Sequence, residues 1–373
     1  MRLKQLVFFA ASRLGVTARV RDSAWRRRRL PILCYHGISL ADEHEWDPTL
    51  YLSAATFRRR LEWLARHRYQ VLPLGDAIRR LYADTLPPRS VALTFDDGTT
   101  DFAEVAVPLL REFGMPATVY VATYYAAHRL PVFDVALAYL LWKGRASRAD
   151  LSPLVPAARP MPVASVADRD EAWRVLTEWA AEQDLDVHGK DALLARVAAT
   201  LRTDYALFRA SGMLQIMTEE SLRSLPADLV DVQLHTHRHR TPSNEESFRR
   251  EIDDNRRALA AVRGEDRPTT QFCYPLGRWH SDFLPWLRRE GVTGAVTCVP
   301  VLADRHADPL LLPRYVDADS QPLSAFEAWV SGFAALVPVS RRHSLEVARI
   351  RRVTNAPREL ERAGRGAAAT AGG

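Results

Sequence analysis

The chain of 373 residues is long enough for one large α/β domain or two smaller domains. Its 47% hydrophobic and 26% charged residues are typical of a globular protein with a sizeable core, which excludes collagen-like, coiled-coil and wholly disordered chains. The net charge of +6 is uneven: residues 1–30 hold nine basic residues and one acid, and residues 341–373 hold eight and three. The part between them is therefore net acidic, which argues against a nucleic-acid-binding core.

The sequence shows no membrane span and no secretion signal. No apolar run approaches the 18 residues that a spanning helix needs, and Leu6–Ala11 is shorter than a signal-peptide core. The three cysteines, Cys34, Cys273 and Cys298, are too few and too scattered for a disulfide framework. We therefore expect a cytoplasmic enzyme whose basic ends are available for a peripheral contact with the inner face of the membrane.

From about residue 31 the chain alternates short strand-like runs with helical stretches. The expected strands are Pro31–Ile38, Gln70–Leu74, Ser90–Phe95, Ala117–Thr123, Asp231–Leu234, Thr269–Tyr274, Gly294–Val299 and Leu310–Pro313. The expected helices between the earlier strands are Phe57–Tyr69, Gly75–Tyr82 and Thr100–Phe113. Such alternation predicts parallel strands covered by helices, and about seven units favour a barrel, which places its chemistry at the carboxyl ends of its strands.

Composition divides the chain into three parts. Residues 1–30 form a basic N-terminal segment, residues 31–330 carry the α/β pattern, and residues 331–373 form a basic C-terminal segment. The final AGRGAAATAGG cannot bury a core, so we expect the end of the chain to be disordered. Between about 126 and 212 the strand rhythm stops, and helical patterns at Asp134–Trp142 and Glu171–Asp184 flank the Pro-rich connector Ser152–Pro162. We expect a helical insertion over or beside the barrel.

Two adjacent carboxylates, Asp96 and Asp97, follow the expected strand Ser90–Phe95 within the sequence TFDDG. Like charges repel, so the pair needs water or a cation beside it. One carboxylate can bind a metal ion while the other serves as a base. Asp-Asp-Gly is also a common turn sequence, and this pattern alone leaves both interpretations open.

Three histidines, His235, His237 and His239, follow the expected strand Asp231–Leu234. His235 and His239 face the same side if the chain rolls into a helical turn, whereas His235 and His237 share a face of a strand. Neutral imidazoles at either spacing are good ligands for Zn²⁺ and similar ions. A polar loop without a metal ion is the alternative.

Together the two motifs resemble the polysaccharide deacetylases of the NodB-homology family, carbohydrate esterase family 4. The first family motif, TFDDG, is present unaltered as Thr94–Gly98, and the second, H-[ST]-x-x-H, is matched by His235–His239. The resemblance implies a distorted (β/α)₇ barrel, here with a helical insertion. It also implies a divalent metal ion, with Zn²⁺ as first candidate, and hydrolysis of the N-acetyl group of an N-acetylhexosamine-containing polysaccharide or glycan intermediate. The implied metal ligands are Asp97, His235 and His239.

Further matches extend the resemblance to about residues 31–330. Ile32–His36 looks like the opening of exopolysaccharide-type members, and Phe272–Gly277 resembles the third motif. In the family, Asp96 would be the catalytic base, and the backbone N–H of Leu276 would stabilise the oxyanion. The implied substrate-binding and oxyanion residues are Tyr274, Pro275, Leu276 and Gly277.

Two departures from the family pattern concern catalysis. The third-motif arginine is replaced by Cys273, so we expect Arg314, after the last expected strand, to orient Asp96, with Arg278 as second candidate. The fifth motif, Leu-x-His, has no match, so His36 is the first candidate for the general acid. The other candidates are His280, His306 and His343.

Other function classes stay open on the sequence. A binuclear amidohydrolase would use His235 and His237, but that pair normally lies on the first barrel strand. A binding module could use the run Arg26–Arg29 on an acidic membrane or on nucleic acid, and the acidic middle disfavours nucleic acid. A deacetylase fold that lost activity through the two departures is the third alternative.

Overall fold

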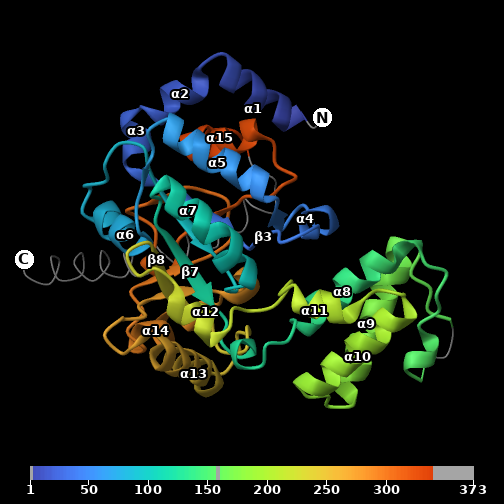
Figure 1. Cartoon of the computed structure of the whole chain (residues 1–373). Coiled ribbons are helices and arrows are strands. Elements are labelled where there is room, and N and C mark those ends of the chain that lie inside the picture. The colour runs from blue at the N-terminus through green and yellow to red at the C-terminus, as the bar shows by residue number, and fades with distance from the viewer. Residues whose placement is uncertain (1–2, 157–159, 339–373) are drawn as a thin grey trace, which may run out of the picture.

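The computed structural model describes residues 3–156 and 160–338. Its centre is a curled sheet of parallel strands in the order β10-β9-β8-β7-β6-β2-β12, with β5 paired to β6 (Figure 1). The strands are β2 (Ile32–Tyr35), β5 (Gln70–Val71), β6 (Ser90–Phe95), β7 (Ala117–Val121), β8 (Val230–Leu234), β9 (Gln271–Cys273), β10 (Gly294–Val296) and β12 (Tyr315–Val316). A parallel bridge between Val296 and Leu312 links β10 to the segment that leads into β12. The predicted α/β barrel is confirmed.

Helices pack outside this sheet and supply the apolar faces that cover it (Figure 1). They are α5 (Ala54–Arg66), α6 (Leu74–Tyr82), α7 (Val107–Phe113), α12 (Glu219–Ser224), α13 (Glu245–Arg263), α14 (Phe283–Arg289) and α15 (Leu323–Ser331). In α5, Phe57, Leu61 and Leu64 are fully buried, as their helical spacing predicts. The expected helix Thr100–Phe113 begins with a π-helical turn, Phe102–Ala106, which continues into α7.

The predicted final strand, Leu310–Pro313, is wrong. Pro309–Leu311 form a 3₁₀ turn, in which the Asp308 side chain accepts a hydrogen bond from the N–H of Leu310. Strand β12 begins only at Tyr315. The fixed φ of Pro309 suits the first position of such a turn, and the apolar residues after it therefore form a turn. The apolar pattern alone predicted a strand.

The N-terminal segment packs onto the barrel through α1 (Leu3–Arg13), α2 (Val16–Arg21) and α3 (Ala24–Arg27). Phe8 of α1 is buried in the barrel core. Arg26 is 1% exposed and donates hydrogen bonds to the carbonyl oxygens of Val330, Arg29 and Ser90. This arginine of the basic run is therefore structural and is not available to an acidic partner.

Two short pairings lie at the edge of the barrel. β1 (Arg29–Leu30) pairs with β11 (Ala303–Asp304), and β3 (Gly37–Ile38) pairs with β4 (Tyr51–Leu52), which follows α4 (Glu43–Trp46). Among the described helices, none is both long enough and apolar enough to cross a bilayer. The C-terminal segment begins with the turn Phe333–Leu336, and its residues from 339 onward lie outside the described part.

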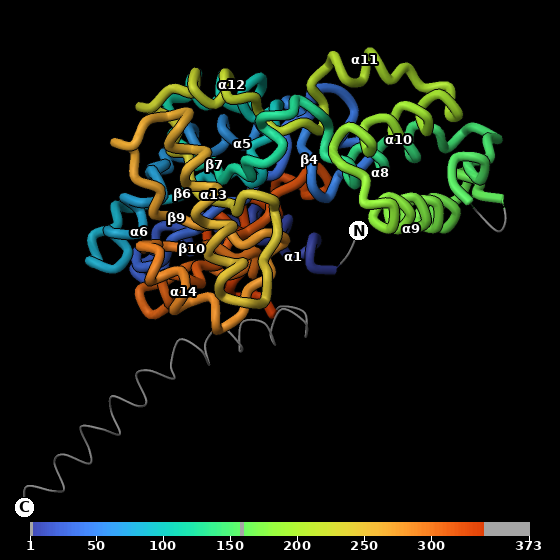
Figure 2. Tube along the Cα trace, turned by 90° about the horizontal axis from the view of Figure 1, so that it is seen from below, coloured from blue at the N-terminus to red at the C-terminus, as the bar shows by residue number. Residues whose placement is uncertain are grey.

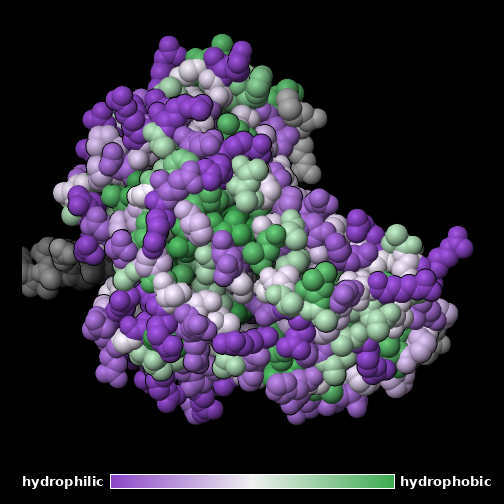
Figure 3. All heavy atoms as spheres, viewed as in Figure 1, coloured by the Kyte–Doolittle hydropathy of each residue, from purple (hydrophilic) through white to green (hydrophobic). Residues whose placement is uncertain are grey.

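The helical insertion stands beside the barrel (Figures 1 and 2). It consists of α8 (Phe133–Lys143), α9 (Val166–Glu182), α10 (Val187–Thr200) and α11 (Tyr205–Ala210), which share a hydrophobic core of their own. Asp42 joins it to the barrel by accepting hydrogen bonds from the Tyr139 hydroxyl and the Lys143 ammonium, each at 2.5 Å. Hydrophobic residues gather in the middle of the face that Figure 3 shows, around α7 and toward the insertion.

Candidate active site

Three potential metal ligands meet at the carboxyl ends of β6 and β8. His235 Nε2 lies 3.1 Å and His239 Nε2 lies 3.2 Å from Oδ1 of Asp97. Their ligand atoms all lie within 4.8 Å of one another. The barrel thus brings together a carboxylate and two imidazoles that are more than 130 positions apart in the chain.

The backbone conformation of both loops makes this convergence. Asp97 has φ 68°, and Gly98 after it has φ 76°. A Cβ atom at Gly98 would come within 2.8 Å of the Val121 side chain on β7, so this sharp turn requires glycine. In the second loop, Thr236 and His239 have φ values of 60° and 52°. The chain does not form a helical turn here; two left-handed residues bring His239 back toward the site instead.

The hydrogen bonds of His235 fix the role of its ring nitrogens. Its Nδ1 lies 2.9 Å from the carbonyl oxygen of Cys273, which can only accept, so Nδ1 carries a proton. In the neutral ring, Nε2 then presents a lone pair to the Asp97 carboxylate, and two acceptors face each other. A cation relieves that repulsion, and one carboxylate with two imidazole nitrogens is a donor set suited to Zn²⁺.

The charges of this group shift its proton affinities. Burial lowers the pKa of His239, but the neighbouring Asp97 carboxylate outweighs it and leaves the His239 pKa raised. Burial raises the pKa of Asp97, yet His239 and His235 hold it well below its ordinary value. Asp97 is therefore ionised at neutral pH, as a metal ligand must be.

Helix α13 holds the histidine loop from outside. Asn255 accepts a hydrogen bond from the backbone N–H of His235 and donates to the carbonyl oxygen of Val121, both at 2.9 Å. Glu251 accepts from the backbone N–H of Arg238 at 2.8 Å. Both α13 side chains are almost fully buried. Sequence reasoning missed them, although polar residues on the buried face of an amphipathic helix were a usable signal.

His237 points away from the other two histidines. Its Nδ1 lies 2.9 Å from the hydroxyl of Thr123, and its ring packs edge-on against Tyr124 with centroids 5.6 Å apart. The alternative ligand pair of His235 and His237 is therefore not formed. This geometry removes the basis of the binuclear amidohydrolase interpretation.

Asp96 lies next to the ligand group and is paired with Arg314. The guanidinium donates to both carboxylate oxygens, at 2.6 and 2.7 Å, and both side chains are almost fully buried. Arg314 also donates to the carbonyl oxygen of Thr297 and to the hydroxyl of Thr94. Burial alone would raise the pKa of Asp96, but the Arg314 charge and hydrogen bonds outweigh it and lower that pKa. Arg278, the second candidate, is exposed.

The general-acid candidates occupy different environments. His36 follows β2, and its Nε2 lies 3.8 Å from Oδ2 of Asp96, with 21% of the side chain exposed. Its Nδ1 is buried without a hydrogen-bond partner in the described part of the chain. His280 is exposed beside Asp282, and His306 is exposed. His343 lies outside the described residues.

The third-motif loop presents only some of its residues to solvent. Tyr274 is 1% exposed and its hydroxyl donates to the carbonyl oxygen of Leu310, so this side chain cannot line an open substrate groove. Pro275 is buried too. Leu276 is 69% exposed and has φ 57°, while Gly277 has φ 64°. The turn therefore leaves the Leu276–Gly277 backbone as the accessible part of the loop.

The cysteines are scattered in sequence but gather around the Asp96–Arg314 pair. The Cys34 thiol donates to Oδ2 of Asp96 at 3.5 Å. The sulfur atoms of Cys273 and Cys298 lie 3.2 and 3.6 Å from Nη2 of Arg314. The signal that sequence reasoning passed over was position: Cys34 and Cys273 both stand at the carboxyl ends of strands that carry family motifs.

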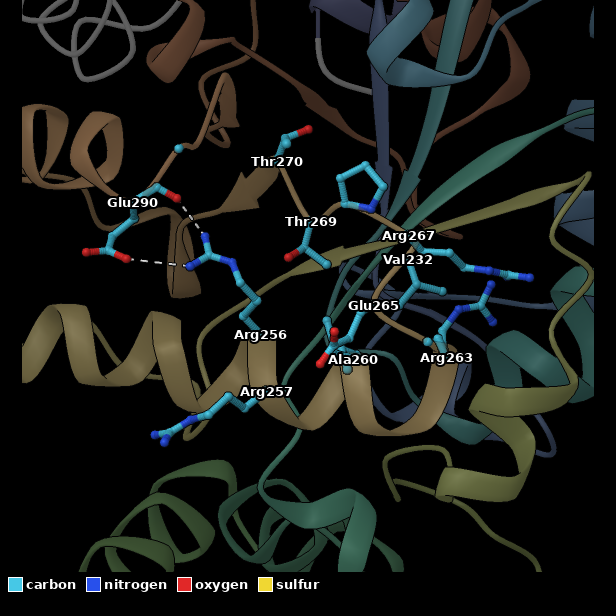
Figure 4. Close-up of a pocket in the computed structure, with 14 residues that line it drawn as sticks. Val232, Arg256, Arg257, Ala260, Arg263, Glu265, Arg267, Thr269, Thr270 and Glu290 are labelled. Atoms are coloured by element: carbon cyan, nitrogen blue, oxygen red, sulfur yellow. Dashed lines mark hydrogen bonds and ion pairs between the residues drawn. The ribbon is translucent and has the colours of Figure 1, made fainter.

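A separate pocket of about 450 Å³ lies at the opposite, amino-terminal ends of β9 and β10 (Figure 4). Four of its 14 lining residues are arginines, and one of them, Arg256, is bound to Glu290. None of the residues that line it belongs to the ligand group or to the Asp96–Arg314 pair. The chemistry of the described site therefore lies elsewhere, at the carboxyl face.

Comparison with known proteins places this geometry in context. The polysaccharide deacetylase family model matches residues 83–153 and 174–295, about half of the chain. The Bacillus subtilis protein YxkH, named for the same family, is 34% identical over 112 residues, which span 29% of this chain and 38% of YxkH.

Solved structures show the same fold at low sequence identity. The Streptococcus pyogenes deacetylase PplD, solved with acetate, is 18% identical, with a TM-score of 0.53 over 80% of this chain and 96% of PplD. IcaB from Ammonifex degensii is 16% identical, with a TM-score of 0.50 over 81% of this chain and 97% of IcaB.

Proposed function

Because the chain belongs to the polysaccharide deacetylase family, we propose that it is a metal-dependent hydrolase of the N-acetyl group of N-acetylhexosamine residues in a polysaccharide or glycan intermediate. The observation that carries this proposal is the convergence of Asp97, His235 and His239 beside the Asp96–Arg314 pair. A partly exposed ligand group next to a buried, ionised carboxylate is the arrangement that metal-assisted amide hydrolysis needs.

The ligand group would hold a divalent ion, with Zn²⁺ as first candidate. Bound there, such an ion would acidify water and polarise the amide oxygen. The chain prepares the site in advance. Cys273 O holds the His235 ring so that Nε2 faces Asp97, and Asn255 anchors the His235 backbone. These contacts reduce the cost of ordering the ligands when the ion binds.

Asp96 is the proposed base. Arg314 keeps the Asp96 carboxylate ionised and donates a hydrogen bond to each of its oxygens. The carboxylate therefore keeps the same orientation in every turnover. Thr94 and Thr297 hold the guanidinium in turn. Arg314 thus acts as a positioning residue that takes over the task of the arginine replaced by Cys273.

His36 is the proposed donor of a proton to the departing sugar amine. It lies at the same strand ends as Asp96, is partly exposed, and its Nε2 is 3.8 Å from Asp96 Oδ2. The backbone N–H of Leu276, in the exposed turn after β9, is the proposed oxyanion donor. Together these groups would protonate the leaving nitrogen and stabilise the charge on the former carbonyl oxygen.

The insertion lies next to the histidine loop, where we propose that the saccharide binds. A row of rings runs from the histidine loop to the insertion: Tyr124 contacts His237 and His128, and His128 contacts His188 of α10. Tyr124 and His128 are half-buried. Partly exposed rings at the rim suit the apolar faces of sugar residues.

The test is acetate release from N-acetylglucosamine oligomers by the purified, metal-loaded chain, with new free amines counted in the same samples. We expect metal chelation to abolish release and readdition to restore it. His239→Ala, matched for folding by circular dichroism, should release none. No release from the wild type over a panel of N-acetylated glycans, with metal bound, would instead support an inactive deacetylase fold.

One observation favours an additional contact with anionic membrane lipids. Leu3, Leu6 and Val7 are 78, 46 and 38% exposed, and their spacing places them along one side of α1; Leu14, directly after this helix, is 72% exposed. Arg13 is exposed on the same helix, within a segment of nine basic residues. We propose that this face lies on an anionic membrane surface, because apolar area and basic charge together favour such binding.

Vesicle sedimentation tests this contact. The full chain should bind vesicles that contain phosphatidylglycerol, bind phosphatidylcholine vesicles less, and lose binding in high salt. Leu6→Gln should weaken binding, whereas Val166→Gln, at an exposed apolar position of α9, should not. Equal binding by both variants, or a dimer in place of vesicle binding, would contradict the proposal.

A further inference from the structure

The three cysteine thiols around the Asp96–Arg314 pair have no part in the proposed hydrolysis. Cys34 and Cys298 form the pair that can most readily become a disulfide bond. Their sulfur atoms and a carboxylate oxygen of Asp96 all lie within 4.8 Å of one another. Cys34 is fully buried at the end of β2, and Cys298 is half-buried after β10. All three cysteines are free thiols in this structure.

We propose that Cys298 is a peroxide-reactive thiol whose oxidation ends in a disulfide bond to Cys34. The ligand class is a small hydroperoxide such as hydrogen peroxide. Its effect on turnover rests on the proposed function, whereas the thiol chemistry itself does not. Cys273 is the less suitable partner, because its sulfur is held by Arg314 Nη2 at 3.2 Å.

The surroundings of Cys298 favour its thiolate, which is the reactive form. Hydrogen bonding with the Cys34 thiol, helped by the Arg314 charge against the effect of burial, lowers the pKa of Cys298. Burial raises the pKa of Cys34 well above its ordinary value. One sulfur of the pair is therefore the nucleophile and the other keeps its proton.

Access comes through the third-motif turn. Gly277 packs on Cys298, where an added Cβ would lie 3.3 Å from the Cys298 Cβ, and Leu276 before it is 69% exposed. Cys298, which is itself partly exposed, therefore faces a residue without a side chain on this side. Hydrogen peroxide is small and needs less room to reach such a sulfur than a bulky disulfide reagent does.

The chemistry balances as two successive displacements. The Cys298 thiolate attacks one peroxide oxygen, the O–O bond breaks, and hydroxide leaves with Cys298 converted to sulfenic acid. The Cys34 sulfur then attacks the Cys298 sulfur, the S–O bond breaks, and water leaves as the disulfide forms. The Cys34 proton leaves with the displaced hydroxide as water, and the hydroxide of the first step takes up the proton that Cys298 released when it ionised. The two thiols lose two electrons, and the peroxide is reduced to two waters.

Disulfide formation would disturb the carboxylate pair. The sulfurs must close to about 2.0 Å, which removes the Cys34 hydrogen bond to Asp96 and draws Cys298 away from Arg314. Both changes act on groups that orient the proposed base. We expect turnover to fall by about tenfold or more, which is a part of the roughly 10²–10⁴-fold that general acid–base catalysis supplies.

Peptide mass spectrometry of the full, metal-loaded chain after hydrogen peroxide treatment tests the proposal. We expect a cross-link between the peptides that contain residues 34 and 298, with Cys273 still alkylatable. Cys34→Ser should leave a sulfenic acid on Cys298 that dimedone traps, Cys298→Ser should show neither product, and Cys273→Ser should still form the cross-link. A cross-link to Cys273, or unmodified Cys298 under peroxide that oxidises free glutathione, would overturn the proposal.

Activity provides a second arm that separates the two proposals. Peroxide should lower acetate release about tenfold, a thiol reductant should restore it, and Cys298→Ser should keep whatever activity it has under peroxide. If the wild type forms the cross-link but releases no acetate under any condition, the thiol proposal stands and the deacetylase proposal fails. A cross-link without any loss of existing activity would refute the predicted effect on the base.

Discussion

Replacement of Arg314 by alanine tests the link between burial, charge and catalysis in this site. The change leaves the Asp96 carboxylate 3% exposed and without its two charge-assisted hydrogen bonds. Removing one partner of a buried ion pair typically costs roughly 3–5 kcal/mol of the free energy of unfolding, because an uncompensated charge remains. We expect a loss of that size at neutral pH, measured by urea unfolding of the metal-loaded protein.

The same change should reverse the pH dependence of stability. In the wild type, Arg314 holds the Asp96 pKa below its unfolded value, so the stabilisation is present above that value and is lost as pH falls through the folded pKa. Without Arg314, burial raises the folded pKa above the unfolded one. The variant should therefore gain stability relative to the wild type as pH falls and Asp96 becomes protonated.

Kinetics separate a positioning role from a merely structural one. For Arg314→Ala we expect kcat for acetate release to fall by ~10²-fold or more, the acidic limb of the pH–rate profile to move upward, and metal content to stay near that of the wild type. Arg314→Lys should recover part of kcat, since it restores the charge without the two-pronged geometry. Unchanged stability and an unchanged pH profile in Arg314→Ala would refute the reasoning.

The remaining predictions concern the metal ligands and one buried acid. His239→Ala should lower bound Zn²⁺ strongly while leaving the circular dichroism spectrum intact, because the side chain is 32% exposed; full metal retention would exclude it as a ligand. Asp96→Asn should abolish turnover but keep the metal, whereas Asp97→Asn should lose both; equal metal loss in the two variants would show that their roles are not divided. Burial raises the pKa of Asp101 to about 7, so stability should fall as pH rises from the unfolded pKa toward 7. Asp101→Asn should flatten this part of the urea-unfolding profile, and an unchanged slope would exclude Asp101 as its source.

The sequence by itself determined those features that depend on neighbouring residues. Short apolar runs that alternate with helical apolar patterns determined the order of strands and helices. The fully buried strand Ser90–Phe95 and the buried face of α5 show this agreement. The position of Asp97 and Gly98 directly after a buried strand determined the turn at the first motif. These features were readable because steric and hydrophobic preferences act over one turn or one strand.

Only the tertiary structure decided which distant groups meet. Arg314 contacts Asp96 across 218 positions because it lies in the segment that joins β10 to β12. The residues before it form a turn where a strand was predicted. His237 is excluded from the ligand group by its contact with Thr123 at the end of β7, and the scattered Cys34 and Cys298 become neighbours. Each outcome depends on how the strand ends are arranged around the curled sheet. The sequence pointed to the Arg314–Asp96 pair and to the ligand group only through the family resemblance. Local residue patterns do not specify these meetings, because the contacts that establish them join residues far apart in the chain.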